Sequence, residues 1–391
     1  MSRPLDNIRV LDLTQAYSGP FCTMQLADFG AEVIKIESPD GDQSRGWRPF
    51  KNDWSAYFAG LNRNKYGIVI NLKTEEGKQA LRDLIAVSDV LCENFKVGTL
   101  ERLGFSYQTM QEINPRLIYA SVSGYGTGTS YSDRPAYDLV AQAKGGLMTV
   151  TGHIGGEPVT TGPAIADSFA GAYMCIGILT ALHDRERTGK GSRVDISMLD
   201  TVFSILENAV VRYTVVGDEP GCTGDVGAGA APFDSYMAKD GKCVICCATD
   251  RLYHRLCDVM GKPEMKTDPR YLTGRTRYEH YFTELKPTIE SWTTTKTLAE
   301  LEDIMTEAGI PYSAINKISA ITESDLIRQR NMLWEIYQPG MDSEIRFQGC
   351  PVKIDTADDS IRKAAPLLGE DSYHVFRDLL GYDEAQIEKL I

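Results

Sequence analysis

Asp167 is the residue whose type and position best fit covalent chemistry. It precedes the most apolar run of the chain, 169–182, which predicts a long buried helix. An aspartate there could simply cap the helix, because its oxygens accept hydrogen bonds from the free amides of the first turn. It could instead be a nucleophile, since a carboxylate can attack an activated acyl group and a helix N-terminus stabilises an anion. The surrounding sequence must decide between the two.

Short apolar segments alternate with helical segments over the first half of the chain, a pattern typical of a parallel β-sheet covered by helices. The expected strands are 8–13, 32–37, 67–72, 90–95, 117–123 and 193–197, and the expected helices are 20–30, 74–86, 107–113, one after Asp167, and one from 198 to about 216. We therefore expect an α/β fold whose large domain holds a Rossmann-like parallel sheet.

The composition divides the chain into four parts. Residues 1–216 carry the alternating pattern, and residues 217–231 are rich in glycine, as in a linker or mobile loop. Residues 232–329 predict a smaller α+β domain. Residues 330–391 have too few apolar side chains for a core of their own. We expect this last part to pack back on the first, so that the large domain is discontinuous, in a chain of 391 residues that is long enough for two domains.

Charge and hydropathy exclude several classes of protein. The net charge of −13 argues against nucleic-acid binding, which needs a basic surface to neutralise phosphates. The apolar run 169–182 is shorter than the ~20 residues that cross a bilayer. The N-terminus lacks the apolar segment and cleavage site of a signal peptide. We expect a cytoplasmic protein without membrane contact.

Cysteine and histidine usage predicts neither disulfides nor a metal. Nine cysteines, an odd number scattered along the chain, fit a reducing compartment. Cys243 and Cys246 have C-x-x-C spacing, but they lie in a strand-like run, so we interpret them as structural. The five histidines show no metal-binding spacing and no second C-x-x-C completes a zinc site, so no metal is expected.

The common nucleotide and hydrolase motifs are missing. The segment 14–20 after the first expected strand holds one glycine, so it has no G-x-G-x-x-G turn for NAD or FAD. The sequence also lacks the G-x-x-x-x-G-K-[ST] loop of ATPases and the G-x-S-x-G elbow of serine hydrolases.

A series of short motifs resembles the family III coenzyme A transferases. In order they are VLDLT at 10–14 with GP at 19–20, GAEVIKIE at 30–37, NRNK at 62–65, NLK at 71–73, ENF at 93–95, LGF at 103–105, NPRLI at 114–118, SGYG at 123–126, RTGKG at 187–191 and PLLGE at 366–370. Each motif is weak alone, but their fixed order over nearly the whole chain makes the resemblance specific.

The resemblance implies that Asp167 is the catalytic aspartate, because the family's aspartate begins the helix before the R-x-T-G-x-G turn. Its carboxylate would attack an acyl-CoA thioester to give a mixed anhydride and CoA thiolate, and the thiolate would return to form an aspartyl-CoA thioester. Exchange of the carboxylic acid and reversal complete the transfer. Coenzyme A thioesters are then substrates, and no cofactor is bound permanently.

Further site residues are implied by the same resemblance. Coenzyme A would be held by Leu72, Lys73, Asn94, Phe95, Arg102 and Tyr137. Gln15 and Tyr17 follow the first expected strand, where open α/β sheets bind their ligands, and we expect them to assist catalysis. Gly224, Gly227 and Gly229 are candidates for a lid that excludes water, although the same segment could be an ordinary linker.

The substrates and the assembly follow from the resemblance too. The segments 231–236 and 245–250 look most like the acetyl-CoA:oxalate branch, so we expect a small carboxylate such as oxalate as acceptor and acetyl-, succinyl- or formyl-CoA as donor. The family's subunits interlock as homodimers, and we expect the same here.

Two other functions remain open. An α-methylacyl-CoA racemase shares the expected fold but needs a base on each face of its substrate. Racemases carry Gly-His-Asp where this chain has Ala136, Tyr137 and Asp138, and an ordinary tyrosine with a pKa near 10 is a poor base. A noncatalytic CoA-binding subunit is the second alternative, and the presence of Asp167 argues against it.

Overall fold

The computed structural model describes residues 3–227 and 229–390, which form two compact units. Unit 1 contains Met1–Leu147, Thr160–Leu206 and Asp325–Ile391. Unit 2 contains Met148–Val159 and Glu207–Ser324.

The unit boundaries differ from those expected at 216 and 330, and they place 148–159 in unit 2. Backbone hydrogen bonds explain this placement. Thr223 N donates to Val150 O at 3.2 Å, and Gly224 N donates to Gly152 O at 2.9 Å. These bonds join two stretches that are distant in sequence, so local composition could not reveal them.

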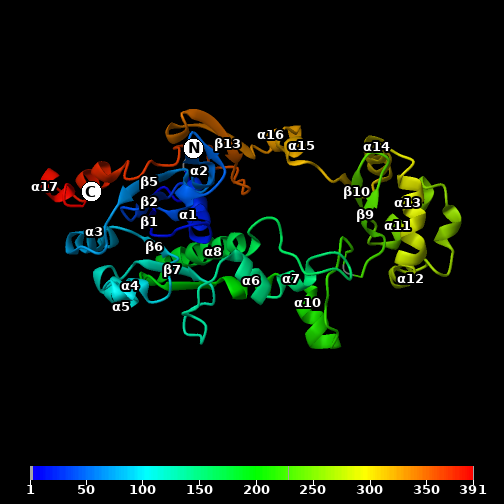
Figure 1. Ribbon diagram of the computed structural model, residues 1–391, viewed down its shortest axis with the longest axis horizontal. Helices are drawn as coiled ribbons and strands as arrows, with labels where there is room; N and C mark the ends of the chain where they lie inside the picture. The colour runs from blue at the N-terminus through cyan, green and yellow to red at the C-terminus, as the bar shows by residue number, and fades with distance from the viewer. Residues whose placement is uncertain (1–2, 228, 391) are drawn as a thin grey trace. The chain divides into compact units, whose positions relative to one another are not determined.

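Unit 1 is built on a six-stranded parallel sheet with the order β5-β2-β1-β6-β7-β8 (Figure 1). The strands are β1 (Arg9–Asp12), β2 (Glu32–Glu37), β5 (Lys65–Val69), β6 (Val90–Glu93), β7 (Ile118–Ser123) and β8 (Arg193–Ser197). Successive strands run outward on one side of β1 and then on the other, which is the doubly wound order with a crevice at β1 and β6. The expected α/β class and Rossmann-like sheet are confirmed.

Helices cover both faces of this sheet. One face packs against α1 (Ser18–Asp28) and α8 (Ile165–Thr188), and the other against α3 (Glu75–Ala86) and α5 (Tyr107–Ile113). Neighbouring strand residues alternate between the layers, so that Val10 contacts the first and Leu11 the second. Other helices of this unit include α2 (Ala56–Asn62), α4 (Thr99–Arg102), α6 (Asp138–Lys144) and α9 (Met198–Ser204).

Helix α8 is longer than the apolar run that predicted it. Its 24 residues contain an 18-residue window of mean hydropathy 1.6, so by length and composition alone the helix could cross a membrane. The expectation that no segment is long enough to cross a bilayer was therefore wrong. A core helix passes the same test. Ala166, Ala170 and Met174 on one side of α8 are fully buried against α1 and the sheet.

Gly171 lets α8 approach α1 closely. A Cβ atom on Gly171 would lie 2.4 Å from the backbone oxygen of Ser18, a distance that no side chain tolerates. Glycine is therefore required one turn after Asp167. This contact brings the second turn of α8 against Ser18, the first residue of α1.

Two expected elements are different in the structure. Strand β5 begins at Lys65 and ends at Val69, whereas it was expected over 67–72. It ends early because a turn follows, in which Thr74 N donates to Asn71 O at 3.1 Å. The Thr74 side chain then caps α3. The helix expected over 198–216 is broken after α9. Glu207 has a φ of 48°, and it is followed by α10 (Asn208–Val211) and η2 (Arg212–Val216) in unit 2.

The C-terminal segment covers the free edge of β5. Gly67 N donates to Asp371 Oδ2 at 2.7 Å, Asp371 N donates to Gly67 O at 2.9 Å, and Val69 N donates to Ser372 Oγ at 3.3 Å. Val375 and Phe376 of η6 (His374–Leu379) then pack in the core beside β5. The segment also includes the hairpin of β12 (Leu333–Gln338) and β13 (Ser343–Gln348), and α17 (Glu384–Ile387).

Unit 2 holds a three-stranded antiparallel sheet with the order β11-β10-β9. Its main elements are β9 (Phe233–Met237), β10 (Lys242–Cys246), α11 (Asp250–Val259), α13 (Lys286–Thr293), α14 (Leu298–Ala308) and β11 (Tyr312–Ala314). Cys243 is buried in β10, and burial raises the pKa of its thiol to about 11. Such a thiol is inert at neutral pH.

Candidate active site

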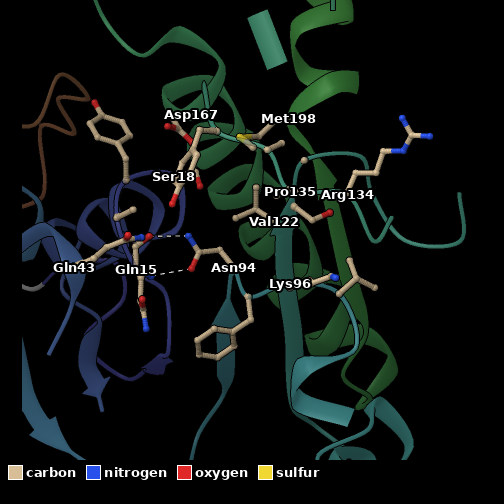
Figure 2. A pocket seen from close by; sticks show the side chains of 18 of the residues that line it. Gln15, Ser18, Gln43, Asn94, Lys96, Val122, Arg134, Pro135, Asp167 and Met198 are labelled. Carbon is tan, nitrogen blue, oxygen red and sulfur yellow. Dashed lines mark hydrogen bonds between the residues drawn. The ribbon is translucent and has the colours of Figure 1, made fainter. Parts of the chain in front are cut away.

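A cavity of about 340 Å³ lies where four parallel strands end (Figure 2). Its walls come from the segments that follow β1, β6, β7 and β8, and from the first turn of α8. The lining residues are Gln15, Ala16, Tyr17, Ser18, Gln43, Trp47, Asn94, Phe95, Lys96, Val97, Val122, Ser123, Gly124, Ser132, Arg134, Pro135, Ala136, Tyr137, Asp167 and Met198. Carboxyl ends of parallel strands are the usual ligand site of open α/β sheets.

Asp167 is the third residue of α8 and does not cap it. The N-cap position is Ala164, whose side chain makes no capping bond, so the capping interpretation is wrong. Burial, and next the nearby Asp138, raise the pKa of the Asp167 carboxyl to about 7, while a hydrogen bond with Ser18 opposes the shift. At neutral pH the group is therefore divided between carboxylate and acid. A carboxyl of this basicity is a stronger nucleophile than an ordinary aspartate.

Asp138 is a site residue that sequence reasoning did not single out. It begins α6 directly after Tyr137, and its Oδ1 accepts a hydrogen bond from the backbone amide of Asp167 at 3.2 Å. Its Oδ2 accepts another from Gln142 Nε2 at 2.6 Å, which fixes the side chain. Its position directly after Tyr137, a residue already implied at the site, could have indicated it from the sequence.

Tyr17 forms the aromatic side of the cavity. Its hydroxyl accepts a hydrogen bond from Ser168 Oγ at 3.2 Å, and its ring stacks on Phe21 with centroids 5.6 Å apart. Burial raises the pKa of Tyr17, and the charge of Asp167 adds to the effect. The phenol is therefore neutral at physiological pH and can act as a hydrogen-bond donor.

Gln15 and Asn94 are joined across the crevice between β1 and β6. Gln15 N donates to Asn94 Oδ1 at 2.8 Å, and Asn94 Nδ2 donates to Gln15 O at 2.7 Å (Figure 2). The Asn94 amide is thus occupied by the backbone of Gln15. The side chain of Gln15 makes neither of these bonds and lines the cavity.

The cations that line the cavity differ from those expected for coenzyme A. Lys96 and Arg134 are in its wall, whereas Leu72, Lys73 and Arg102 are not among the lining residues. Lys73 is exposed before α3, and Arg102 is exposed in α4, where it donates to Thr99 Oγ1 at 2.9 Å. Asn94, Phe95 and Tyr137 do line the cavity. Sequence reasoning passed over Lys96 although it directly follows the ENF motif.

The glycines proposed as a lid belong to unit 2. Gly224 and Gly229 have φ values of 65° and 72°, which favour glycine. A Cβ atom on Gly227 would lie 2.3 Å from the ring of Phe233, so this position is closely packed. Their role as a lid stays a prediction.

Among residues 3–227 and 229–390 no cluster of three or more His, Cys, Asp or Glu side chains could hold a metal ion. The chemistry proposed for the cavity uses carboxyl, hydroxyl and amide groups.

The fold is a doubly wound α/β sheet with a carboxyl of raised pKa in the cavity at its strand ends, and comparisons with known proteins show the class to which it belongs. Residues 5–372 match CoA-transferase family III. Succinyl-CoA:mesaconate CoA-transferase of Haloarcula marismortui is 38% identical over 375 residues, 94% of each chain. Acetyl-CoA:oxalate CoA-transferase of Acetobacter aceti is 40% identical over 370 residues, 94% of this chain and 93% of that protein. A CAIB/BAIF family protein from Brucella suis superposes with a TM-score of 0.86 at 32% identity, covering 97% of this chain and 100% of that one.

The chain belongs to CoA-transferase family III and is an enzyme of the acyl-CoA:carboxylate CoA-transferase class. The family resemblance found in the sequence is confirmed.

Proposed function

We propose that the enzyme moves coenzyme A from an acyl-CoA to a small carboxylic acid, with Asp167 as the covalent nucleophile. The observation that carries the proposal is the Asp167 carboxyl, which is half-buried in the first turn of α8, has a pKa of about 7, and lines a cavity at the carboxyl ends of the strands. A half-buried carboxylate with a raised pKa is suited in such a place to attack a thioester.

The proposed reaction has four balanced steps. The Asp167 carboxylate attacks the thioester carbonyl, so that a mixed anhydride forms and CoA leaves as a thiolate. The thiolate attacks the aspartyl carbonyl and expels the donor acid as a carboxylate, which leaves an aspartyl-CoA thioester. The acceptor carboxylate attacks this thioester and releases the thiolate again. The thiolate then attacks the acceptor's acyl carbon, which yields the new acyl-CoA and regenerates Asp167.

The neighbouring side chains support these steps in the proposal. Each attack places negative charge on a carbonyl oxygen, and donors fixed beforehand stabilise such an oxyanion. The side-chain amide of Gln15 and the neutral phenol of Tyr17 are hydrogen-bond donors in the cavity wall. Ser18 hydrogen-bonds the Asp167 carboxyl and favours its charged form.

For coenzyme A we keep the residues implied by the family and add two cations. Phe95 and Tyr137 would contact the pantetheine arm, while Asn94 would act by holding the Gln15 loop. Lys73 and Arg102 remain candidates for the phosphates, and Leu72 for an apolar contact. Lys96 and Arg134 join them because they line the cavity of Asp167.

The acceptor is proposed to be a small dicarboxylate such as oxalate, with acetyl-CoA or succinyl-CoA as donor. This proposal is supported by the names of the relatives, which transfer coenzyme A to oxalate or mesaconate. We also propose a cytoplasmic homodimer. Its support is an exposed apolar stripe on α8, where Phe169, Tyr173 and Ile176 follow one another at helical spacing.

The test is a panel of acyl-CoA donors against carboxylic acids, with new CoA esters identified by mass spectrometry. Without an acceptor, hydroxylamine should trap the aspartyl-CoA thioester on the peptide that contains Asp167. Asp167→Ala should lose the adduct and about three or more orders of magnitude in turnover. The matched control is Asp200→Ala, which removes an acid from the first turn of α9 outside the cavity and should keep the adduct. An adduct on another carboxylate would overturn the assignment.

A further inference from the structure

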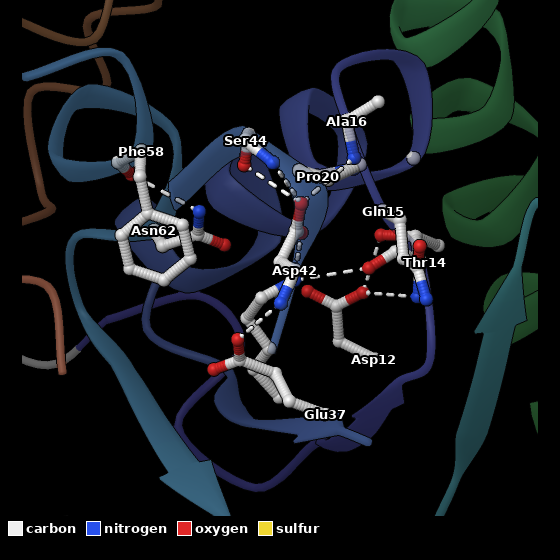
Figure 3. Close-up of polar contacts among 12 residues, drawn as sticks. Asp12, Thr14, Gln15, Ala16, Pro20, Glu37, Asp42, Ser44, Phe58 and Asn62 are labelled. Carbon is white, nitrogen blue, oxygen red and sulfur yellow. Dashed lines mark hydrogen bonds and ion pairs between the residues drawn. The ribbon is translucent and has the colours of Figure 1, made fainter. Parts of the chain in front are cut away.

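A balanced network of charges lies next to the loop that follows β1, and Figure 3 labels its three carboxylates, Asp12, Glu37 and Asp42. It consists of three ion pairs, Lys35–Asp42 at 2.8 Å, Lys65–Asp12 at 2.9 Å and Arg45–Glu37 at 2.7 Å. Both side chains of the first two pairs are at most 1% exposed. Burying charges this completely is costly even when they are paired, so stability alone does not explain the network.

The Lys35–Asp42 pair reaches the backbone of the loop. Ala16 N donates to Asp42 Oδ1 at 3.2 Å, and Lys35 Nζ donates to the carbonyl oxygen of Thr14 at 2.9 Å. Asp42 is itself fixed, since its Oδ1 also accepts bonds from Ser44 N at 2.8 Å and Ser44 Oγ at 2.7 Å. The pair therefore holds a donor and an acceptor of the loop on a rigid support.

Both members of the pair are ionised at neutral pH. Burial opposes the charge of each, but Lys35 lowers the pKa of Asp42, and Asp42 followed by Asp12 raises the pKa of Lys35. The hydrogen bonds to the loop are thus made by charged groups, which strengthens them.

The loop needs this support because Ala16 has an unfavourable backbone conformation. Its φ is 67°, in the left-handed region that a residue with a Cβ atom rarely adopts. For alanine this region is disfavoured by about five- to thirtyfold in population. The bonds from Thr14 and Ala16 to the ion pair offset this penalty.

Ala16 lies between the two residues that the proposed reaction uses. Gln15 and Tyr17 both line the cavity of Asp167, and a change at Ala16 would redirect both. We propose that the Lys35–Asp42 ion pair is a positioning device for the reaction, which holds Ala16 in its left-handed conformation and so keeps Gln15 and Tyr17 at the cavity of Asp167. This inference rests on the proposed function.

The first test removes the pair as a unit. In Lys35→Met with Asp42→Leu the pairs Lys65–Asp12 and Arg45–Glu37 remain balanced, so no unpaired charge is buried. Replacing a buried ion pair by apolar residues is often tolerated, and we expect the double variant to fold. Its kcat should fall about tenfold or more, while KM for the acyl-CoA changes by less than about threefold, because an orienting element rather than a binding contact has been lost.

Two further variants separate positioning from stability. Lys35→Met with Asp42→Asn retains an oxygen that can accept from Ala16 N, and should keep most of the activity that the leucine variant loses. Adding Ala16→Gly to the leucine variant should restore kcat by about fivefold, because glycine adopts the left-handed conformation without penalty. A merely structural role would not predict this rescue.

The control is a partly buried ion pair that does not contact the loop. Arg185 NH2 and Asp89 Oδ1 are 2.9 Å apart, and Asp89 precedes β6, at the amino ends of the strands rather than at the carboxyl ends where the loop lies. Arg185→Met with Asp89→Asn should lower the melting temperature and leave kcat of the folded protein unchanged. The inference is overturned if the leucine variant keeps its kcat, or if Ala16→Gly restores nothing. If the unmodified enzyme forms no aspartyl adduct, the proposed function fails instead.

Discussion

The backbone amide of Asp167 and the carboxylate of Asp138 are hydrogen-bonded at 3.2 Å, so two acids are held together at the start of α8. Asp138 uses one oxygen for this bond and the other for Gln142 Nε2 at 2.6 Å. Its negative charge is thereby fixed near the Asp167 carboxyl, and it is the second cause, after burial, of the raised pKa of Asp167. The pKa of the proposed nucleophile is therefore raised by a neighbouring acid that does not itself react.

Asp138→Asn should move the pH dependence of the covalent step. The variant removes the repelling charge, so the pKa of Asp167 falls and the carboxylate is populated at lower pH. In the unmodified enzyme the rate of adduct formation should rise with pH through about 7, where Asp167 ionises. In the variant the inflection should move down by about one pH unit. Stopped-flow measurement of adduct formation from pH 5 to 9 gives both curves, and the exposed Asp133→Asn is the control. An unmoved inflection would contradict the role of Asp138.

Asp167→Asn should stabilise the protein at high pH. The pKa of Asp167 is higher in the folded protein than in the unfolded chain, so folding favours the protonated side chain. The stability that this group contributes is fully present below about pH 4 and is lost as the pH rises through about 7. The amide cannot ionise and escapes this loss. Above pH 7 the variant should gain up to about 4 kcal/mol in unfolding free energy, and below pH 4 the two proteins should be similar. Urea unfolding at pH 4 and pH 8 measures the difference, and equal gains at both would refute the assigned cause.

Gly171→Ala should disturb both stability and catalysis. The added Cβ would lie 2.4 Å from Ser18 O, so α8 must move away from α1 and carry Asp167 with it. We expect a loss of about 1–3 kcal/mol in stability, as in other overpacked cores, together with reduced kcat. Gly60→Ala is the matched control, because a Cβ there meets nothing within 4 Å and Gly60 lies inside α2. A Gly171 variant as stable and active as the Gly60 variant would show that the approach is not tight.

The enzyme should not exchange the α-proton of its substrate. The resemblance noted in the sequence implies that Tyr137 takes the place of the racemases' histidine, and its side chain is 62% exposed. Histidine, the usual general base of such a proton transfer, is thus replaced at this position. Incubation with a 2-methylacyl-CoA in deuterated water should leave the α-carbon unlabelled by mass spectrometry. Rapid deuterium incorporation would favour the racemase alternative.

In solution the protein should have twice the chain mass of 43.3 kDa. Ile176 on α8 is 57% exposed, so Ile176→Lys places a charge in the apolar stripe and should weaken a dimer formed there. Val87→Lys, at an exposed apolar position after α3, is the control. Light scattering at low micromolar concentration reports the mass, and a purely monomeric unmodified protein would rule out the dimer.

The elements that were predicted correctly are those whose bounds are marked by the sequence at or next to the element itself. The helix 107–113 and the strands 32–37 and 193–197 match the structure to the residue, because polar residues or caps bound clear apolar patterns. Gln15 was expected at the site because it follows the first parallel strand, where open α/β sheets bind their ligands. Asn94 and Asp167 were assigned to the site by the family resemblance. The structure brings these three into the same cavity wall.

The remainder depends on contacts between distant residues. Asp42 is 26 positions from Ala16 in the hydrogen bond that joins them, and no pattern near either residue indicates it. Arg134 lines the cavity only because the connection after β7 folds back, whereas Lys73 and Arg102 looked equally suitable as isolated cations. The break at Glu207 reflects a left-handed backbone in a sequence with ordinary helix formers.

The cover on β5 has a consequence for synthesis of the chain. Gly67 and Val69 present their outward amides to Asp371 and Ser372, which are separated from them by about 300 residues in the hydrogen bonds concerned. On the ribosome Asp371 and Ser372 emerge only after the whole of unit 2. Until then the sheet has an open edge, and an open edge can pair with another nascent chain. A ribosome that stalls before codon 371 would therefore leave an aggregation-prone product.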